Sequence, residues 1–378
     1  MTETDLFSSS YAQARSRFIA AVQAHGGQVT SYTNPHASGI EDETLTIDTA
    51  WFGPRDAPSV LFNTSGIHGA EGYAGSAAQL DWISNGGPHH LDEGVAVLLV
   101  HAVNPYGFSW GLRGTENNVD LNRNWLDHDA PYPENPLYVE IHPLLCPKNI
   151  DDKAVRRLLN EGTRLIAKHG QWAIEDALSR GQYTHPDGFH FGGTSLEWST
   201  LRLQEIVKND LSLATEIGFI DWHTGPVGDG DLIFLCFSPP RSVGFRQAEA
   251  WWGKQALDAN HVNKLWGSKR PTRHGIMFWG VENMLSAQTR IAGAVIEFRS
   301  STQKHNAGDA LRVPMLERWL RFEGGLDAPE ASSYLAEIRN DYAPTRASFQ
   351  TNVIANARTT YAQVLSGLAH RQIPDAAD

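Results

Sequence analysis

Short apolar runs alternate with longer segments of helical spacing in the first part of the chain. Residues 59–63 form a brief apolar run that breaks at Ser65 and Gly66, and residues 95–100 form an unbroken aliphatic run. Runs of this length are typical of strands that are buried on both faces. Residues 72–83, between them, have the Ala-rich spacing of a helix. The pattern predicts a strand, a helix and a second strand in succession.

The alternation continues through the second half of the chain. Residues 151–178 and 195–213 have helical spacing, and the second of these helices is expected to start at Thr194-Ser195 with Glu197 in its first turn. Strands that alternate with helices favour an α/β fold with a mostly parallel sheet. Further strands are predicted over residues 217–222, 232–237 and 293–298.

Two other regions have a different character. Residues 127–147 are rich in Pro, His and Tyr, which predicts a long irregular loop. From about Asp309 the pattern is helical, including residues 316–322 and 361–368. We therefore divide the chain into an N-terminal segment (1–58), an α/β domain (59–308) and a helical C-terminal extension (309–378) that packs on that domain.

Composition and charge narrow the choice of partners. The chain has 378 residues, with 31 Lys and Arg against 43 Asp and Glu, so its net charge is −12. This balance argues against binding to nucleic acid or to an anionic membrane, and favours small molecules or peptides. The polar amino terminus has no secretory signal pattern, and the apolar runs are too short to cross a bilayer, so we expect a cytoplasmic protein. Oligomeric state is not predicted.

Metal-binding chemistry is indicated by two histidines and a glutamate. Cys146 and Cys236 are the only cysteines, so we expect any metal to be held by His and carboxylate side chains. His68 and Glu71 form an H-x-x-E motif directly after a predicted strand, where α/β folds place ligands. His223 follows another predicted strand. The alternative interpretations are a solvated helix face for the motif and a core histidine for His223.

A carboxylate and a basic loop are further candidates for chemistry. Glu297 lies within an apolar predicted strand, where burial of a carboxylate is costly without a partner or a function. It could act as a general base, or it could form an ion pair with another arginine or with Arg299, which lies on the same face of that strand. Residues 113–125 contain two arginines and several asparagines, which suit the binding of a carboxylate but also suit a solvated loop.

In this order, the motifs resemble those of the zinc carboxypeptidase superfamily. That superfamily has H-x-x-E, then Asp-x-Asn-Arg-Asn, then a distant His, and then a Glu on a late strand. The similarity covers roughly residues 59–299 and is greatest to a bacterial carboxypeptidase-like branch, with a more remote likeness to the aspartoacylase and succinylglutamate desuccinylase branch. The motifs that carry it are residues 65–72 (SGIHGAEG), 104–108 (NPYGF), 119–124 (VDLNRN), 181–183 (GQY) and 221–225 (DWHTG).

The resemblance implies a three-layer α/β/α fold of the zinc carboxypeptidase type and one zinc ion per chain. It implies that His68, Glu71 and His223 are the zinc ligands. Asp120 matches the aspartate that accepts the free ring N–H of the first histidine, and Glu297 matches the general base and acid.

Two further roles are implied by the same resemblance. Arg113 matches the arginine that stabilises the oxyanion, and Asn122 and Arg123 match the pair that holds the terminal carboxylate of the substrate. The family's capping tyrosine has no counterpart, because no tyrosine occurs between Thr224 and Phe298. Tyr183 is the candidate that we name to replace it.

The expected activity is zinc-dependent hydrolysis of an amide bond next to a free carboxylate, in a short peptide or an N-acyl amino acid. Two alternatives are open at this point. One is an aspartoacylase-like deacylase of N-acyl amino acids. The two enzymes differ in which side of the cleaved amide bond is bound by the specificity pocket. The other is a non-catalytic binding module that a metal stabilises.

Overall fold

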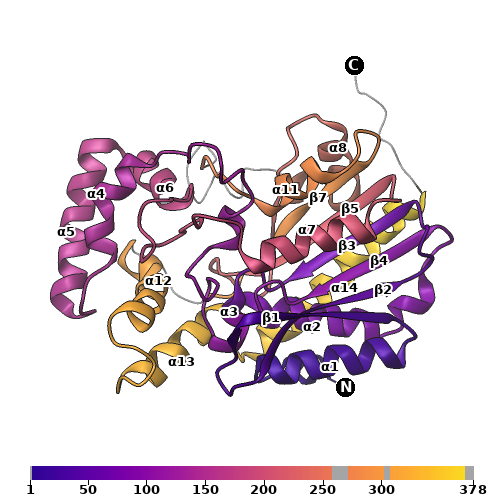
Figure 1. Ribbon diagram of the computed structural model, residues 1–378, viewed down its shortest axis with the longest axis horizontal. Helices are drawn as coiled ribbons and strands as arrows, with labels where there is room; N and C mark the ends of the chain where they lie inside the picture. Colours follow the sequence, from indigo (N-terminus) through magenta and orange to yellow (C-terminus); the bar gives the residue numbers. More distant parts are fainter. Residues whose placement is uncertain (1, 258–270, 302–306, 371–378) are drawn as a thin grey trace.

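A seven-stranded sheet runs through the centre of the computed structural model, which describes residues 2–257, 271–301 and 307–370 (Figure 1). The strand order is β1-β2-β4-β3-β5-β7-β6. The strands are β1 (Gln28–Ser38), β2 (Thr44–Phe52), β3 (Ser59–Ser65), β4 (Val95–His101), β5 (Glu216–Thr224), β6 (Leu232–Leu235) and β7 (Arg290–Phe298).

The four central strands are parallel and the outer strands are antiparallel. β4, β3, β5 and β7 form the parallel part, while β1, β2 and β6 pair in the antiparallel sense. Every residue of β3, β4 and β5 is buried, which explains their continuous apolar sequences. The strands expected from the apolar runs are confirmed. β1 and β2 join the same sheet although they fall within the predicted N-terminal segment, and the predicted domain division stays a prediction.

Helices cover both faces of the sheet, which confirms the three-layer α/β/α class. One core lies between the sheet and α1, α2, α8 and α14, and a second lies between the opposite face and α7 and α11. The helices of these layers are α1 (Tyr11–Ala24), α2 (Gly72–Ser84), α7 (Trp198–Asp210), α8 (Val243–Trp252), α11 (Met277–Met284) and α14 (Ala347–His370). The others are α3 (Pro105–Trp110), α4 (Pro136–Leu145), α5 (Asp152–His169), α6 (Gln171–Ser179), α9 (Lys254–Leu257), α12 (Ala307–Phe322) and α13 (Ala331–Tyr342).

The prediction of an irregular loop over residues 127–147 is wrong for the second half of this segment, which forms α4. The side chain of Asn135 caps this helix by accepting from the backbone amide of Tyr138, and Pro136 occupies the first turn, where it is tolerated. Tyr138, Ile141 and Leu145 follow at helical spacing and are buried. This apolar stripe outweighs the proline and histidine content that suggested a loop.

Two predicted helix boundaries also change. Gly170, with φ of 86°, separates α5 from α6 within the segment expected to be one helix. α7 starts at Trp198 with Glu197 as its flanking residue, so Glu197 lies before the first turn and Thr194-Ser195 lies farther upstream. The carboxylate of Glu197 accepts instead from Thr115 and Asn117, in the loop after α3.

The C-terminal extension is helical as expected, and its last helix completes one face of the sheet. α14 packs across β3 and β5, where the hydroxyl of Tyr361 donates to Oδ1 of Asn63 and accepts from Nε1 of Trp222. Residues 371–378 of the predicted extension lie outside the described residues. Among the described residues, no helix combines the length and apolar character needed to span a membrane.

Replacing Tyr361 by Phe is expected to lower the free energy of unfolding by about 1–3 kcal/mol, because the buried polar groups of Asn63 and Trp222 lose their shared partner. Urea unfolding of Y361F measures this change. Y334F is the control. Tyr334 is only half-buried, and its hydroxyl forms no hydrogen bond with any of the described residues. Equal stability of wild type and Y361F would contradict the account.

Candidate metal centre

Three predicted site residues lie at the carboxyl ends of neighbouring parallel strands. His68 follows β3 in the turn that leads into α2, His223 lies near the end of β5, and Glu297 lies near the end of β7. β5 pairs with both β3 and β7, and this register sets His223 directly beside Glu297. Open α/β sheets bind ligands at these strand ends.

The turn after β3 approaches α3 closely because residue 69 is a glycine. A Cβ atom on Gly69 would lie 2.0 Å from the backbone carbonyl carbon of Gly107, which no side chain tolerates. The amide of Gly69 donates to the carbonyl oxygen of Arg113 at 3.2 Å. The turn that carries His68 and Glu71 is therefore fastened to the loop that carries Arg113.

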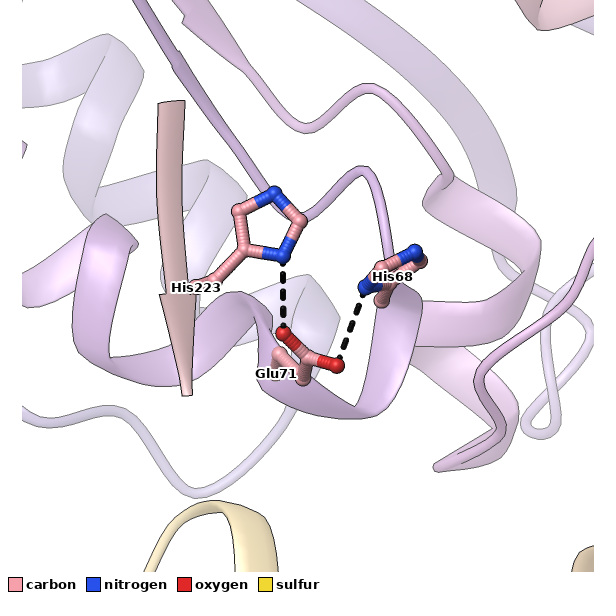
Figure 2. Close-up of side chains that lie close together, drawn as sticks. All are labelled: His68, Glu71 and His223. Carbon is pink, nitrogen blue, oxygen red and sulfur yellow. Dashed lines mark hydrogen bonds and ion pairs between the residues drawn. The ribbon is translucent and has the colours of Figure 1, made fainter. Parts of the chain in front are cut away.

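The side chains of His68, Glu71 and His223 converge, as Figure 2 shows. Oε1 of Glu71 lies 3.0 Å from Nδ1 of His68, and Oε2 of Glu71 lies 3.2 Å from Nδ1 of His223. All three side chains are buried, and one ligand atom from each lies within 4.8 Å of the others. Two imidazole nitrogens and a carboxylate oxygen in this arrangement are a donor set that suits zinc.

An aspartate contacts the ring nitrogen of each histidine that does not face Glu71. Nε2 of His68 lies 3.1 Å from Oδ1 of Asp120, and Nε2 of His223 lies 2.6 Å from Oδ2 of Asp221. A carboxylate on one ring nitrogen fixes the tautomer and leaves the other nitrogen to face a metal. Asp120 thus contacts the ring of His68, and its role behind a metal ligand stays a prediction. Asp221 was not among the site residues predicted from the sequence. Its position two residues before His223 on a predicted strand could have indicated it, because such residues share one face of the strand.

Arg113 reaches the same cluster from the loop after α3. Its Nη1 lies 2.8 Å from Oε1 of Glu71, and its Nε and Nη2 each lie 3.3 Å from Oδ2 of Asp120. Nη2 also lies 2.8 Å from Nε2 of His68. The side chain is 23% exposed, unlike the carboxylates that it contacts, so Arg113 can also meet a bound molecule.

The charges around the cluster keep its carboxylates ionised. Burial alone would raise the pKa of Glu71, but the charges of His68 and Arg113 and hydrogen bonds from His223 hold this pKa well below its usual range. The pKa of Asp120 is likewise lowered against burial, chiefly by Arg113. Burial opposes the protonated form of His223, yet Asp221 and Glu71 raise its pKa. Ionised carboxylates are the form that binds a metal.

Glu297 forms no ion pair with Arg299 or with another arginine among the described residues, so the ion-pair interpretation is wrong. Nη1 of Arg299 contacts Oδ2 of Asp231 at 2.6 Å instead. Oε2 of Glu297 is buried and has no hydrogen-bond partner among the described residues. Burial raises the pKa of Glu297 to about 7, against the opposing effect of His223. A buried carboxylate atom without a partner is costly, and it lies beside the candidate ligands.

Asn122 and Arg123 lie in the short helical turn that follows Asp120. Oδ1 of Asn122 accepts from the backbone amide of Met277 at 3.0 Å, which ties this turn to α11. The guanidinium of Arg123 donates from Nη1 to the carbonyl oxygen of Asn122 and from Nη2 to that of Ser179. Its Nε is buried without a partner among the described residues, and burial lowers its pKa. The predicted contact with a substrate carboxylate stays a prediction.

Tyr183 lies against Arg123. Its hydroxyl donates to the backbone carbonyl oxygen of Arg123 at 2.7 Å, and its ring stacks on that of Tyr132 with centroids 5.0 Å apart. The phenol is therefore engaged by the protein in this structure, and its predicted contact with substrate stays a prediction.

Three residues near the site have no counterpart in the sequence-based prediction. Nδ1 of His190 lies 3.0 Å from Oδ2 of Asp120, and Oε2 of Glu317 accepts from the backbone amide of Arg113 at 2.8 Å. Tyr342 is buried, and the charges of Glu317, Arg113 and Glu71 all act on its phenol. Glu317 and Tyr342 belong to the C-terminal helices, beyond the motifs found within residues 59–299, so no motif points to them.

Fold and site together define an α/β protein with a buried His-Glu-His cluster at the carboxyl edge of its sheet, and this cluster fits a metal ion. The chain belongs to the family described as "Protein of unknown function (DUF2817)", which it matches over residues 7–356. No curated protein matches the chain.

Several solved structures are similar to this one at low sequence identity. Bovine thrombin-activatable fibrinolysis inhibitor, solved with a tick carboxypeptidase inhibitor, is 11% identical with a TM-score of 0.45, covering 95% of this chain and 98% of that one. Carboxypeptidase A from Helicoverpa armigera is 12% identical with a TM-score of 0.41, covering 88% and 74%. A candidate succinylglutamate desuccinylase/aspartoacylase from Shewanella frigidimarina is 14% identical with a TM-score of 0.32, covering 78% and 70%.

Replacing His68 and His223 by Ala should remove one zinc ion per chain, because two of the three candidate ligands are lost. Elemental analysis of the dialysed protein measures the loss relative to wild type. H169A is the matched control, because His169 is a half-buried surface histidine paired with Glu140. A double variant that retains as much zinc as wild type would show that these histidines are not ligands.

Proposed function

We propose that the protein is a zinc-dependent hydrolase that cleaves an amide bond next to a free carboxylate, in a short peptide or an N-acyl amino acid. The observation that carries this proposal is the buried Oε2 atom of Glu297, which has no hydrogen-bond partner among the described residues and belongs to a residue directly beside His223 at the same strand ends as the candidate ligands. A binding site that only needed metal for stability would gain nothing from such a costly group.

Glu297 has the properties of a general base and acid. Its pKa is raised to about 7 by burial, and a group with a pKa near neutrality can both accept and return a proton. Its free Oε2 would take a proton from the attacking water and return it to the leaving amine. His68, Glu71 and His223 would hold zinc, which supplies a Lewis acid for the carbonyl and increases the acidity of water.

Arg113 would stabilise the negative charge that develops on the carbonyl oxygen. It is a cation beside the candidate ligand Glu71, and it retains exposed surface while its Nε and Nη2 atoms are oriented by Asp120. A donor that is oriented before the reaction stabilises the transition state without the cost of reorganisation. The carboxylate of Glu317 fixes the backbone of Arg113 by accepting a hydrogen bond from its amide.

Arg123 supports a substrate with a carboxylate. The partners of its two Nη atoms are neutral backbone carbonyls, and its Nε has none among the described residues. Asp120 acts on it only at longer range and is shared with Arg113 and His68. A buried guanidinium without a bound carboxylate is costly, and a substrate carboxylate would supply the missing charge.

Glu297→Gln should lower kcat by about 100- to 10,000-fold, because glutamine keeps the size of the side chain but cannot accept the proton. Zinc content and KM should change little. The measurement is steady-state hydrolysis of a library of dipeptides and N-acyl amino acids, together with zinc analysis. Glu93→Gln is the control, since Glu93 is exposed. Near wild-type turnover in the Glu297 variant would refute its role, and absence of turnover in the wild type across the library would favour a binding module.

Matched substrates with a free or an amidated carboxylate should differ in kcat/KM by at least ~100-fold in favour of the free acid, because truncating a partner of a buried charge costs several kcal/mol. Arg123→Ala should remove this preference, and Arg123→Lys should restore only part of it, because lysine lacks the planar fork. Arg164→Ala, at an exposed arginine, is the control. Equal rates for acid and amide in the wild type would make Arg123 structural and favour the internal cleavage expected of a deacylase.

A further inference from the structure

A second group of metal-ligating side chains lies in the part of the chain between β4 and β5. His142 and Cys146 lie one turn apart at the end of α4, and Asp187 lies in the loop after α6. Nε2 of His142 is 3.1 Å from Oδ1 of Asp187, and Sγ of Cys146 is 4.0 Å from the backbone oxygen of Asp187. One ligand atom from each of the three lies within 4.8 Å of the others, the same compactness as in the His-Glu-His cluster.

The chemistry of this group differs from that of the first cluster. An imidazole, a thiol and a carboxylate form a nitrogen, sulfur and oxygen set, and a thiolate selects soft or borderline ions such as zinc over magnesium or calcium. His142 and Cys146 are four residues apart on a helix, so their side chains share one face. The remaining ligand, Asp187, comes from a separate loop, so an ion would join two segments that are 41 residues apart.

The nearby arginine does not make this position unsuitable for a cation. Nη2 of Arg318 lies 2.9 Å from Oδ2 of Asp187, and its Nη1 lies 2.6 Å from Oε1 of Glu323. One guanidinium thus faces two carboxylates, which leaves one negative charge in excess. A divalent ion that displaced the thiol proton to solvent would bring the group to neutrality. Oδ1 of Asp187 is the oxygen that Arg318 does not contact.

From this geometry we propose that His142, Cys146 and Asp187 form a second, structural site for a zinc-class ion. The ion fastens α4 to the loop between α6 and α7, with water in the remaining position. That loop continues from Asp187 to His190, whose Nδ1 contacts Asp120 behind the first cluster. The backbone oxygen of Phe191 also accepts from the amide of Asp120 at 2.8 Å. The second ion thereby supports the aspartate that orients His68.

The sulfur ligand makes the second site distinguishable from the first, whose candidate ligands include no cysteine. The purified full chain is stripped of metal and titrated with Co²⁺, which gives a thiolate-to-cobalt charge-transfer absorption only when sulfur is a ligand. Wild type should show this absorption, and Cys146→Ser should lose it while it retains the visible bands of cobalt in the first cluster. An unchanged charge-transfer absorption in Cys146→Ser, or none in the wild type, would overturn the proposal.

Zinc stoichiometry gives a second readout that does not depend on hydrolysis. Wild type should hold two zinc ions per chain, and His142→Ala and the His68/His223 double variant should each lose a different one. His169→Ala is the matched control at a nearby surface histidine. One zinc in wild type that is lost only in the His68/His223 variant would refute the second site and leave the proposed function intact.

Alkylation keeps the proposal testable if a variant fails to fold. In the wild-type chain, Zn²⁺ should slow the reaction of Cys146 with iodoacetamide at least tenfold relative to the metal-free protein, as mapped by mass spectrometry. The buried Cys236 should stay unmodified with and without zinc, which checks that the chain remains folded in both samples. Equal rates for Cys146 with and without zinc would refute the site.

Discussion

The structure depends on the cost of burying three ligand side chains together at the ends of the parallel strands. His68, Glu71 and His223 are buried, so each of their polar atoms needs a hydrogen-bond partner or a bound ion. Asp120 and Asp221 pair with the outer nitrogens of the histidines, and Arg113 forms ion pairs with both Glu71 and Asp120. The tight turn at Gly69 brings His68 and Glu71 close to the loop that carries Arg113, and His190 contacts Asp120.

The fold was largely predictable where burial shapes the local sequence. β3, β4 and β5 are buried along their whole length and therefore appear as continuous apolar runs. β1 is mostly exposed or half-buried and has no such run, so it was missed. α4 was missed because its proline and histidine content obscured a three-residue apolar stripe.

The candidate ligands were predictable because a metal site needs particular side chains at fixed spacing after a strand. Asp221 could also be inferred, because alternation along a strand places it on the face of His223. Glu317 and Tyr342 could not, since their proximity to the site arises from the packing of C-terminal helices against a loop some 200 residues earlier, for which the local sequence holds no signal. The same is true of Cys146 and Asp187, whose joint position depends on how α4 meets a distant loop.

The measurement that tests the central claim most directly is anomalous diffraction at the zinc absorption edge from crystals of the zinc-loaded protein. The account predicts a peak between His68, Glu71 and His223, with both Nδ1 atoms about 2.0–2.1 Å from the ion and Glu297 facing it. The direct contacts of Glu71 with both imidazoles would then be replaced by bonds to zinc. A map with no peak at this position, and with Glu71 still bridging the two histidines, would contradict the account.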